Sequence, residues 1–162
     1  MGSADQDFAE FFAARCRRLQ QVGFALCGDW LQAEELTQAT FVRLYRHWGK
    51  VSRGNPDAYA RRVLTNLYLD RARRNREVLR DVLPDPVVGG RGHADDVAAH
   101  VDVGRMLDRL APRMRAVVVL RFLEDLSVAE VAGLLGIAEG TVKSHCNRAM
   151  TLLSEGRAEV ER

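Results

Sequence analysis

Two groups of polar residues have side chains that can bind a polyanion. Residues 59–80 contain the seven arginines Arg61, Arg62, Arg71, Arg73, Arg74, Arg76 and Arg80, against only Asp70 and Glu77. Residues 140–151 carry a second group, which consists of short hydroxyl and amide side chains together with a lysine and an arginine. Basic side chains pair with phosphate, and hydroxyl and amide groups can hydrogen-bond base edges. Both groups favour nucleic acid, although a solvated arginine face explains the first equally well.

Residue patterns for catalysis are missing from the sequence. The chain has no phosphate-binding glycine loop, no metal-ligand spacing and no matched set of nucleophile, base and orienting group. Its three cysteines, Cys16, Cys27 and Cys146, are an odd number without C-x-x-C spacing, so we expect neither a disulfide framework nor a zinc site. An enzyme is the least favoured class, and no cofactor is expected.

The elements that position these residues are predicted to be helices. Apolar residues recur at three-to-four spacing over 8–26, which indicates an amphipathic helix that ends at Gly28. Asp29, with Gln32 three residues on, begins a second helix whose apolar stripe reaches Trp48 and which ends at Gly49.

A loop over Lys50–Asn55 is predicted to separate the second helix from the third. Gly54 interrupts regular structure, and Asn55 followed by Pro56 supplies a cap and a proline at the first helical position. The third helix is predicted to run to about Arg76.

A break in the helical pattern follows at residues 83–92, which hold two of the four prolines and three glycines. We place a flexible linker there. A helix is predicted to resume near Asp95, and another to start at Pro112 and end near Leu123.

The second half contains a helix-turn-helix pattern. Ser127 and Glu130 form a capping box for a short helix that stops at Gly136, and a second helix follows with Ala138 where a capping Ser or Thr is usual. At 100° per residue, one arc of this second helix faces the core through Val142, Cys146, Ala149 and Leu153. The opposite arc carries Gly140, Ser144, Asn147, Arg148 and Thr151, with Lys143 on its flank and His145 between the faces.

Composition agrees with this organisation. The 162 residues are 47% hydrophobic and carry a net charge of +2, which divides into +5 for residues 1–80, −4 for 81–104 and +1 for 105–162. No alternating strand pattern, membrane-length apolar run or secretory signal is present, so we expect a soluble, cytoplasmic protein. The predicted fold class is all-α, in two helical bundles joined by the linker.

Both halves resemble one protein family. The segments AEELTQATFVRLY (33–45) and NPDAYARRVLTNLYLDRARR (55–74) resemble conserved region 2 of sigma factors, and 127–150 resembles their region 4. The combination resembles group IV, or extracytoplasmic-function (ECF), sigma factors of the short actinobacterial, sigma-E-like kind. The resemblance implies a region 2 domain at 5–80, a linker at 81–94 and a region 4 domain at 95–160.

The resemblance implies a dissociable specificity subunit of bacterial RNA polymerase. The implied partners are core polymerase, through its β′ clamp and β flap, and promoter DNA. The positions that match the family's clamp contact are Glu35, Leu36 and Gln38. Core packing is an equal alternative for Leu36. Ala39 stands where the family frequently has an acidic residue. The family also commonly uses an anti-sigma factor, which we list as an expected partner.

Minus-ten recognition is implied for the loop 52–57 and the helix after it, where a base of the opened strand is captured. Arg62, Asn66 and Arg73 fall on one polar arc of this helix. Arginines can follow phosphates, Asn66 can bond a base edge or a local backbone group, and Asp70 can orient a neighbouring arginine. The candidate DNA-binding residues here are Ser52, Arg53, Asn55, Arg62, Asn66 and Arg73, with Tyr68 as an additional stacking candidate.

Minus-thirty-five recognition is implied for the second helix of the helix-turn-helix. Ser144 and Arg148 match base-reading positions, Lys143 and Thr141 match phosphate contacts, and Asn147 lies where promoter preference can vary.

Two other interpretations stay open from the sequence. Residues 141–145 (TVKSH) also resemble LuxR-type regulators, which would require a receiver or ligand domain that residues 1–80 do not suggest. A helical protein-binding regulator without DNA contacts is the second, and salt-sensitive heparin retention would argue against it.

Overall fold

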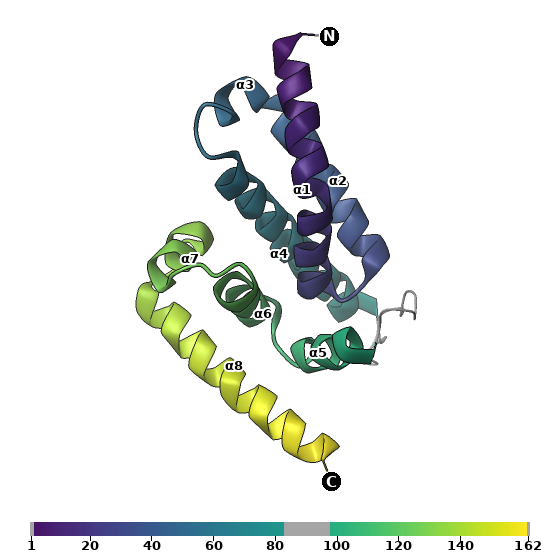
Figure 1. Ribbon diagram of the computed structural model, residues 1–162. Helices are drawn as coiled ribbons and strands as arrows, with labels where there is room; N and C mark the ends of the chain where they lie inside the picture. Colours follow the sequence, from purple (N-terminus) through teal and green to yellow (C-terminus); the bar gives the residue numbers. More distant parts are fainter. Residues whose placement is uncertain (1, 83–97, 162) are drawn as a thin grey trace. The chain divides into compact units, whose positions relative to one another are not determined.

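The computed structural model describes residues 2–82 and 98–161. Every regular element in these two ranges is a helix, so the predicted all-α class is confirmed. The chain divides into two compact units, Met1–Arg91 and Gly92–Arg162 (Figure 1). Most of the predicted linker and the predicted helix start near Asp95 lie outside the described residues.

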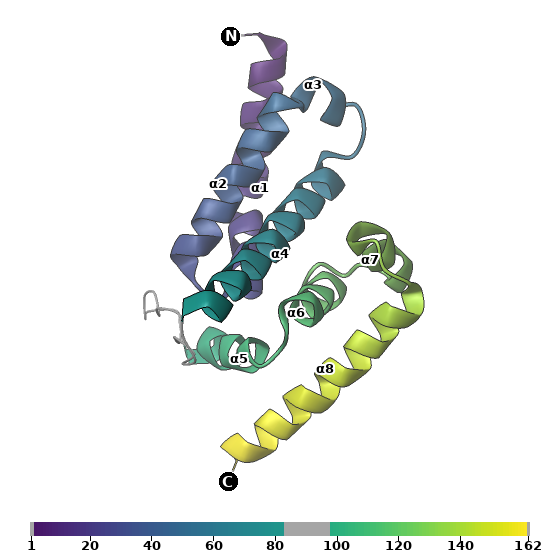
Figure 2. The ribbon, with the colours of Figure 1, turned by 180° about the vertical axis from the view of Figure 1, so that it is seen from behind.

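The first unit is built from three long helices and one short helix. Helices α1 (Ser3–Cys27), α2 (Trp30–Arg46) and α4 (Pro56–Val82) lie side by side. The short helix α3 (Trp48–Val51) lies near the start of α1, and a loop leads from it into α4 (Figure 2).

Local signals set the turn between α1 and α2 as predicted. Gly28 takes the left-handed conformation, with φ 74°, that glycine adopts without strain. The Asp29 carboxylate then accepts a hydrogen bond from the Leu31 amide, at 2.8 Å, and begins α2.

Three predicted boundaries in this unit are wrong. The second helix ends at Arg46, before Gly49, because His47 leaves helical geometry and Trp48 begins a separate turn that buries its ring. Lys50 is therefore helical, and the loop is confined to Ser52–Asn55. The third long helix continues past Arg76 to Val82, since its solvent-exposed arginine, leucine and glutamate residues all favour helix.

The core of the first unit is formed by close helix packing. A Cβ on Gly23 of α1 would lie 3.4 Å from Ala33 of α2, so the two small residues let these helices approach closely. Thr37, Thr40 and Thr65 are buried, and each hydroxyl donates to the carbonyl four residues earlier, at 2.7 to 2.8 Å. These bonds satisfy polar groups that would otherwise be costly to bury.

An aromatic cluster joins α1, α2 and α3. The Trp48 ring centroid lies 5.3 Å from that of Phe8 and 5.2 Å from that of Phe11. At the same end, the Tyr45 hydroxyl donates to the Asp5 carboxylate at 3.1 Å, and this bond to a negative group raises the pKa of Tyr45 above its usual value. The cluster anchors α3 and, through it, the start of the loop.

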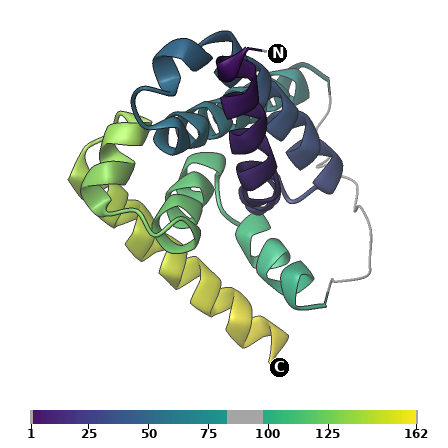
Figure 3. The same ribbon diagram turned by 45° about the horizontal axis from the view of Figure 1, so that its top comes forward.

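The second unit contains α5 (Ala98–Asp108), α6 (Pro112–Val118), a π-helical turn (Val119–Leu123), α7 (Val128–Leu135) and α8 (Glu139–Val160). Figure 3 shows α6 and α7 beside the long α8. The predicted helix start at Pro112 and end near Leu123 are confirmed, but the last turn is wider than an α-helix.

The predicted helix-turn-helix is present in this unit. The Ser127 hydroxyl accepts the Glu130 amide at 3.0 Å, while the Glu130 carboxylate accepts the Ser127 amide at 3.4 Å, which completes the capping box. Gly136 ends α7 with φ 66°, a left-handed conformation. Val117, Leu120, Val131 and Val142 form the core that holds α7 against α8.

A buried arginine stabilises the start of this unit. Arg115 of α6 is 5% exposed and donates to the more exposed Asp108 carboxylate at the end of α5, at 2.7 Å. Because a buried charge needs a partner, this pair fixes the turn between α5 and α6.

Candidate nucleic-acid and protein interfaces

The loop Ser52–Asn55 is held locally at both ends. The amides of Ser52 and Gly54 donate to carbonyls of α3, at 2.8 and 3.1 Å. The Asn55 side-chain oxygen accepts the Ala58 amide at 3.0 Å, so Asn55 caps α4 as predicted. Ser52 and Arg53 are exposed between these anchors.

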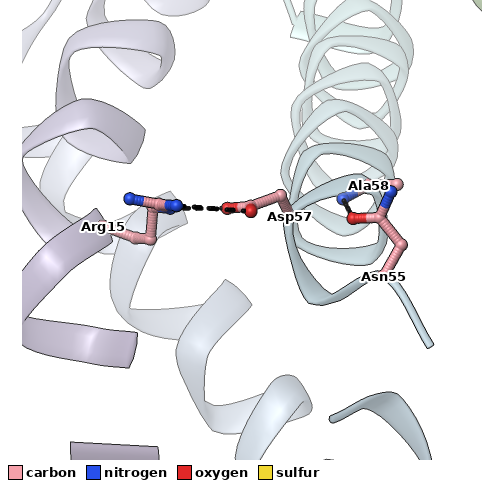
Figure 4. Close-up of polar contacts among 4 residues, drawn as sticks. All are labelled: Arg15, Asn55, Asp57 and Ala58. Carbon is pink, nitrogen blue, oxygen red and sulfur yellow. Dashed lines mark hydrogen bonds and ion pairs between the residues drawn. The ribbon is translucent and has the colours of Figure 1, made fainter. Parts of the chain in front are cut away.

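One residue that the sequence pattern did not indicate pairs with the first turn of α4 from another helix. Figure 4 shows Arg15 of α1 directed at Asp57 in the first turn of α4, with Nε 2.6 Å from Oδ1 and Nη2 3.5 Å from Oδ2. Hydrogen bonding to Asp57, followed by its charge, raises the pKa of Arg15 above its usual value. The two residues are 42 positions apart, so no local spacing pattern signals the pair.

The polar face of α4 has the arrangement that the periodicity predicts. Arg62, Asn66 and Arg73 are exposed, whereas Val63 and Leu64 are buried. Asp70 accepts a hydrogen bond from Arg73 at 3.5 Å, a long contact between exposed groups, in line with the predicted orienting role. Tyr68 is only 8% exposed, so the stacking role considered for it is wrong in this conformation and the residue belongs to the core.

The three residues predicted to contact polymerase do not share one environment. Glu35 and Gln38 are exposed on α2, but Leu36 is 4% exposed and packs in the core. The burial of Leu36 supports the core-packing alternative, while the polymerase contact of these positions stays a prediction. Glu35 already has a partner, since its carboxylate accepts a hydrogen bond from Arg71 of α4 at 2.6 Å.

An exposed apolar stripe on α2 was also missed by sequence analysis. Leu31, Val42 and Tyr45 are each more than half exposed, and they share an arc of about 60° with Gln38. Helical spacing in the sequence could have predicted this stripe, because its residues fall on the face opposite the buried residues Ala33, Leu36 and Thr40. Exposed apolar side chains on one face of a helix provide area that a protein partner can bury.

Helix α8 presents its predicted polar residues to solvent. Thr141, Lys143, Ser144, Asn147 and Arg148 are all exposed, while Val142 and Ala149 are fully buried. Ala138 has N-cap backbone geometry but no side-chain cap, as predicted. Cys146 is half-buried against the core around Val142, which supports a packing role.

The described part of the chain contains neither a membrane-spanning helix nor a cluster of metal ligands. Residues 2–82 and 98–161 contain no helix that is long and apolar enough to cross a membrane. Within the same ranges, no three His, Cys, Asp or Glu side chains come together in a way that could hold a metal ion.

Comparison with known proteins identifies the family. Residues 11–78 match the model of Sigma-70 region 2, and residues 100–153 match that of Sigma-70 region 4. The chain is 37% identical over 155 residues to an RNA polymerase sigma-E factor of Streptomyces avermitilis, which covers 92% of this chain and 84% of the relative. It is 33% identical over 147 residues to the ECF RNA polymerase sigma factor SigE of Mycolicibacterium smegmatis. This match covers 85% of this chain and 56% of that relative.

Solved structures show the same fold. The sigma factor RpoE of Bartonella quintana, in complex with the anti-sigma factor NepR, superposes with a TM-score of 0.77 at 22% identity and covers 97% of this chain and 99% of that chain. CnrH, in complex with the cytosolic domain of CnrY, gives a TM-score of 0.65 at 22% identity and covers 96% and 90%.

The chain belongs to the ECF family of RNA polymerase sigma factors. It is therefore a transcription initiation factor that directs RNA polymerase to promoters. The comparisons give no support to the LuxR-type alternative, because residues 11–78 match sigma region 2.

Proposed function

We propose that the two units divide promoter recognition between them. In this proposal, the unit at residues 5–80 binds core polymerase and the minus-ten element, and the unit at 95–160 reads the minus-thirty-five element. The linker predicted at 81–94 begins only after α4 ends at Val82. The observation that carries the proposal is that each unit exposes a polar face on one helix, α4 or α8, whose opposite face is buried in that unit's own core. Each unit can therefore present its polar face without unfolding.

Minus-ten recognition is assigned to the loop Ser52–Asn55 and the exposed face of α4. Arg53, Arg62 and Arg73 supply positive charge along the strand's phosphates. The exposed amide of Asn66 bonds a base edge of the opened strand, and Ser52 contacts the strand from the loop. Asn55 contributes mainly by capping α4, since its side-chain oxygen already accepts the Ala58 amide.

Minus-thirty-five recognition is assigned to α8. Ser144, Asn147 and Arg148 lie on the exposed arc and have side chains suited to base edges in a major groove. Lys143 and Thr141 lie beside them and contact phosphate, which orients the helix without reading sequence.

Core polymerase is assigned to the exposed face of α2. Glu35 and Gln38 supply polar contacts for the β′ clamp, and the apolar stripe Leu31, Val42 and Tyr45 supplies buried area. Leu36 contributes to this proposal only indirectly, because it is buried on the opposite side of α2 and packs that helix into the core. The β flap is the expected partner of the second unit.

Polymerase is needed to set the distance between the two readers. The promoter elements lie about two helical turns apart, and two small units on a tether cannot by themselves hold that separation. Promoter selection is therefore a property of the complex.

Regulation by an anti-sigma factor, in the cytoplasm, completes the proposal. The solved relative from Bartonella quintana is bound to an anti-sigma factor, and this chain shares its fold. Such a partner would act by covering the α2 face or the DNA-binding faces.

The proposal is tested by reconstituting the full chain with an actinobacterial core RNA polymerase. Fragmented genomic DNA is transcribed, and the transcript starts are sequenced to define the two elements. We expect starts that share one minus-ten and one minus-thirty-five motif and that disappear without the chain. Failure of core polymerase to retain the chain in a pull-down without inhibitor would overturn the proposal.

A further inference from the structure

We propose that Arg15 is a positioning residue for minus-ten recognition. In this proposal its ion pair with Asp57 fixes the first turn of α4, and with it the loop Ser52–Asn55, against α1. The inference rests on the proposed function, because it assumes that this loop and α4 read the minus-ten element.

The first turn of α4 needs an anchor beyond the core. Residues 56–59 are only half-buried, and the first fully packed residue of the helix is Ala60, at 2% exposed. The ends of helices fray because their first amide groups have no partner within the helix. The segment that leads into the proposed DNA-binding face is thus less packed than the middle of α4, where Ala60, Val63 and Leu64 are buried.

The other bonds around the loop act locally. Asn55 caps α4 from within the same turn, and the amides of Ser52 and Gly54 bond back to α3. These contacts fix the loop to one helix or the other, but they do not fix α4 against its neighbours. The Arg15–Asp57 pair differs because it joins the first turn of α4 to the middle of α1, as Figure 4 shows.

The geometry of the pair suits positioning. The Arg15 guanidinium engages both carboxylate oxygens of Asp57, at 2.6 and 3.5 Å, and such two-point contacts constrain direction as well as distance. Asp57 also lies at the second position of α4, where the helix dipole favours a negative charge. Arg15 therefore pairs with a carboxylate that the helix dipole already stabilises at this position.

Because the pair is exposed, its effect on the position of α4 can be measured separately from any effect on folding. The Arg15 and Asp57 side chains are 48% and 45% exposed, and ion pairs this accessible contribute little to stability. We therefore expect that breaking the pair leaves the chain folded and bound to polymerase, and that it changes how selectively the minus-ten element is read.

The test compares four forms of the full chain in holoenzyme: the natural sequence, Arg15→Gln, Asp57→Asn and the double variant. Transcription is measured from the promoter most used in the transcript-start experiment and from the same promoter with a scrambled minus-ten element. The discrimination ratio is the first rate divided by the second. We expect each single variant to lower this ratio about two- to fivefold, and the double variant to lower it no further, because both changes remove one interaction.

Matched controls identify what each outcome means. Arg17→Gln alters another exposed arginine of α1 and should leave the discrimination ratio unchanged. Arg15→Lys keeps the charge and should give a ratio between those of Arg15→Gln and the natural sequence. Equal losses on both promoters, or losses that multiply in the double variant, would overturn the inference. If Arg62→Ala and Asn66→Ala also leave the ratio unchanged, the proposed minus-ten surface itself fails; if they lower it while Arg15→Gln does not, only the positioning role fails.

Discussion

Glu35 on α2 and Arg71 on α4 form an ion pair in which the carboxylate oxygen lies 2.6 Å from the guanidinium nitrogen. The pair connects the face proposed to bind polymerase with the helix proposed to read DNA. Glu35 therefore has two candidate partners, Arg71 within the chain and a basic group on polymerase.

Competition for Glu35 leads to the first prediction. Glu35→Gln should weaken binding to core polymerase by up to about fivefold, since a partly exposed charge pair contributes about 1 kcal/mol or less. Arg71→Met should leave this affinity unchanged or raise it slightly, because it frees the Glu35 carboxylate. Binding is measured with core polymerase in the absence of DNA. Equal weakening by both variants would show that the pair acts through the fold of the unit.

Leu36 gives a second prediction, which separates packing from contact. Leu36→Ala should lower the free energy of unfolding of the first unit by about 2 to 5 kcal/mol, because a buried leucine is truncated. Leu36→Met keeps the volume and should retain both stability and polymerase affinity. Urea unfolding and a core-binding assay on the same preparations check this. Loss of binding by a stably folded Leu36→Met chain would contradict the assignment of Leu36 to the core.

Helix capping in the second unit provides a third prediction. Ala138 has the extended backbone of an N-cap, with φ −69° and ψ 148°, but offers no side-chain acceptor. Ala138→Ser should therefore stabilise this unit by about 0.5 to 1 kcal/mol. Ser127→Ala removes the hydroxyl that accepts the Glu130 amide but keeps the amide of residue 127 that donates to the Glu130 carboxylate, and it should destabilise the unit by about 1 kcal/mol.

Both capping variants are measured by chemical denaturation followed by circular dichroism at 222 nm. If Ala138→Ser does not change the free energy of unfolding, another group already accepts hydrogen bonds from the first amides of α8.

The exposed arc of α8 gives a fourth prediction. Arg148→Ala should weaken binding to the matched minus-thirty-five element and relax sequence preference, by about 1 to 3 kcal/mol of discrimination. Lys143→Ala should weaken all sequences similarly and reduce the salt dependence of binding, because it removes a phosphate contact. Holoenzyme binding to matched and scrambled elements at two salt concentrations tests both. Equal losses on the two elements for Arg148→Ala would refute base reading by this residue.

Sequence patterns were sufficient where structure is set by local chemistry. Gly28, Asp29, Asn55 and the Ser127–Glu130 box all act within a few residues of their own position, and each lies where the pattern predicts. The polar and apolar arcs of α4 and α8 follow for the same reason, since helical periodicity alone assigns their faces.

The features that the sequence did not reveal depend on packing between helices. The break at His47 occurs because Trp48 turns into the aromatic cluster formed with Phe8 and Phe11 of α1. The partners Arg15 and Asp57 are 42 residues apart, and Glu35 and Arg71 are 36 apart. Contacts at such separations are chosen by the fold, so a single sequence does not report them.

The placement of the tryptophan and tyrosine residues makes them an intrinsic fluorescence probe for one half of the chain. Trp30, stacked on Phe24, and Trp48 are the only tryptophans of the chain, and all three tyrosines also precede residue 70. Tryptophan and tyrosine fluorescence therefore originates in the N-terminal half alone. Far-ultraviolet measurements record both halves, so comparing the two signals distinguishes loss of one half from loss of the other without any added dye.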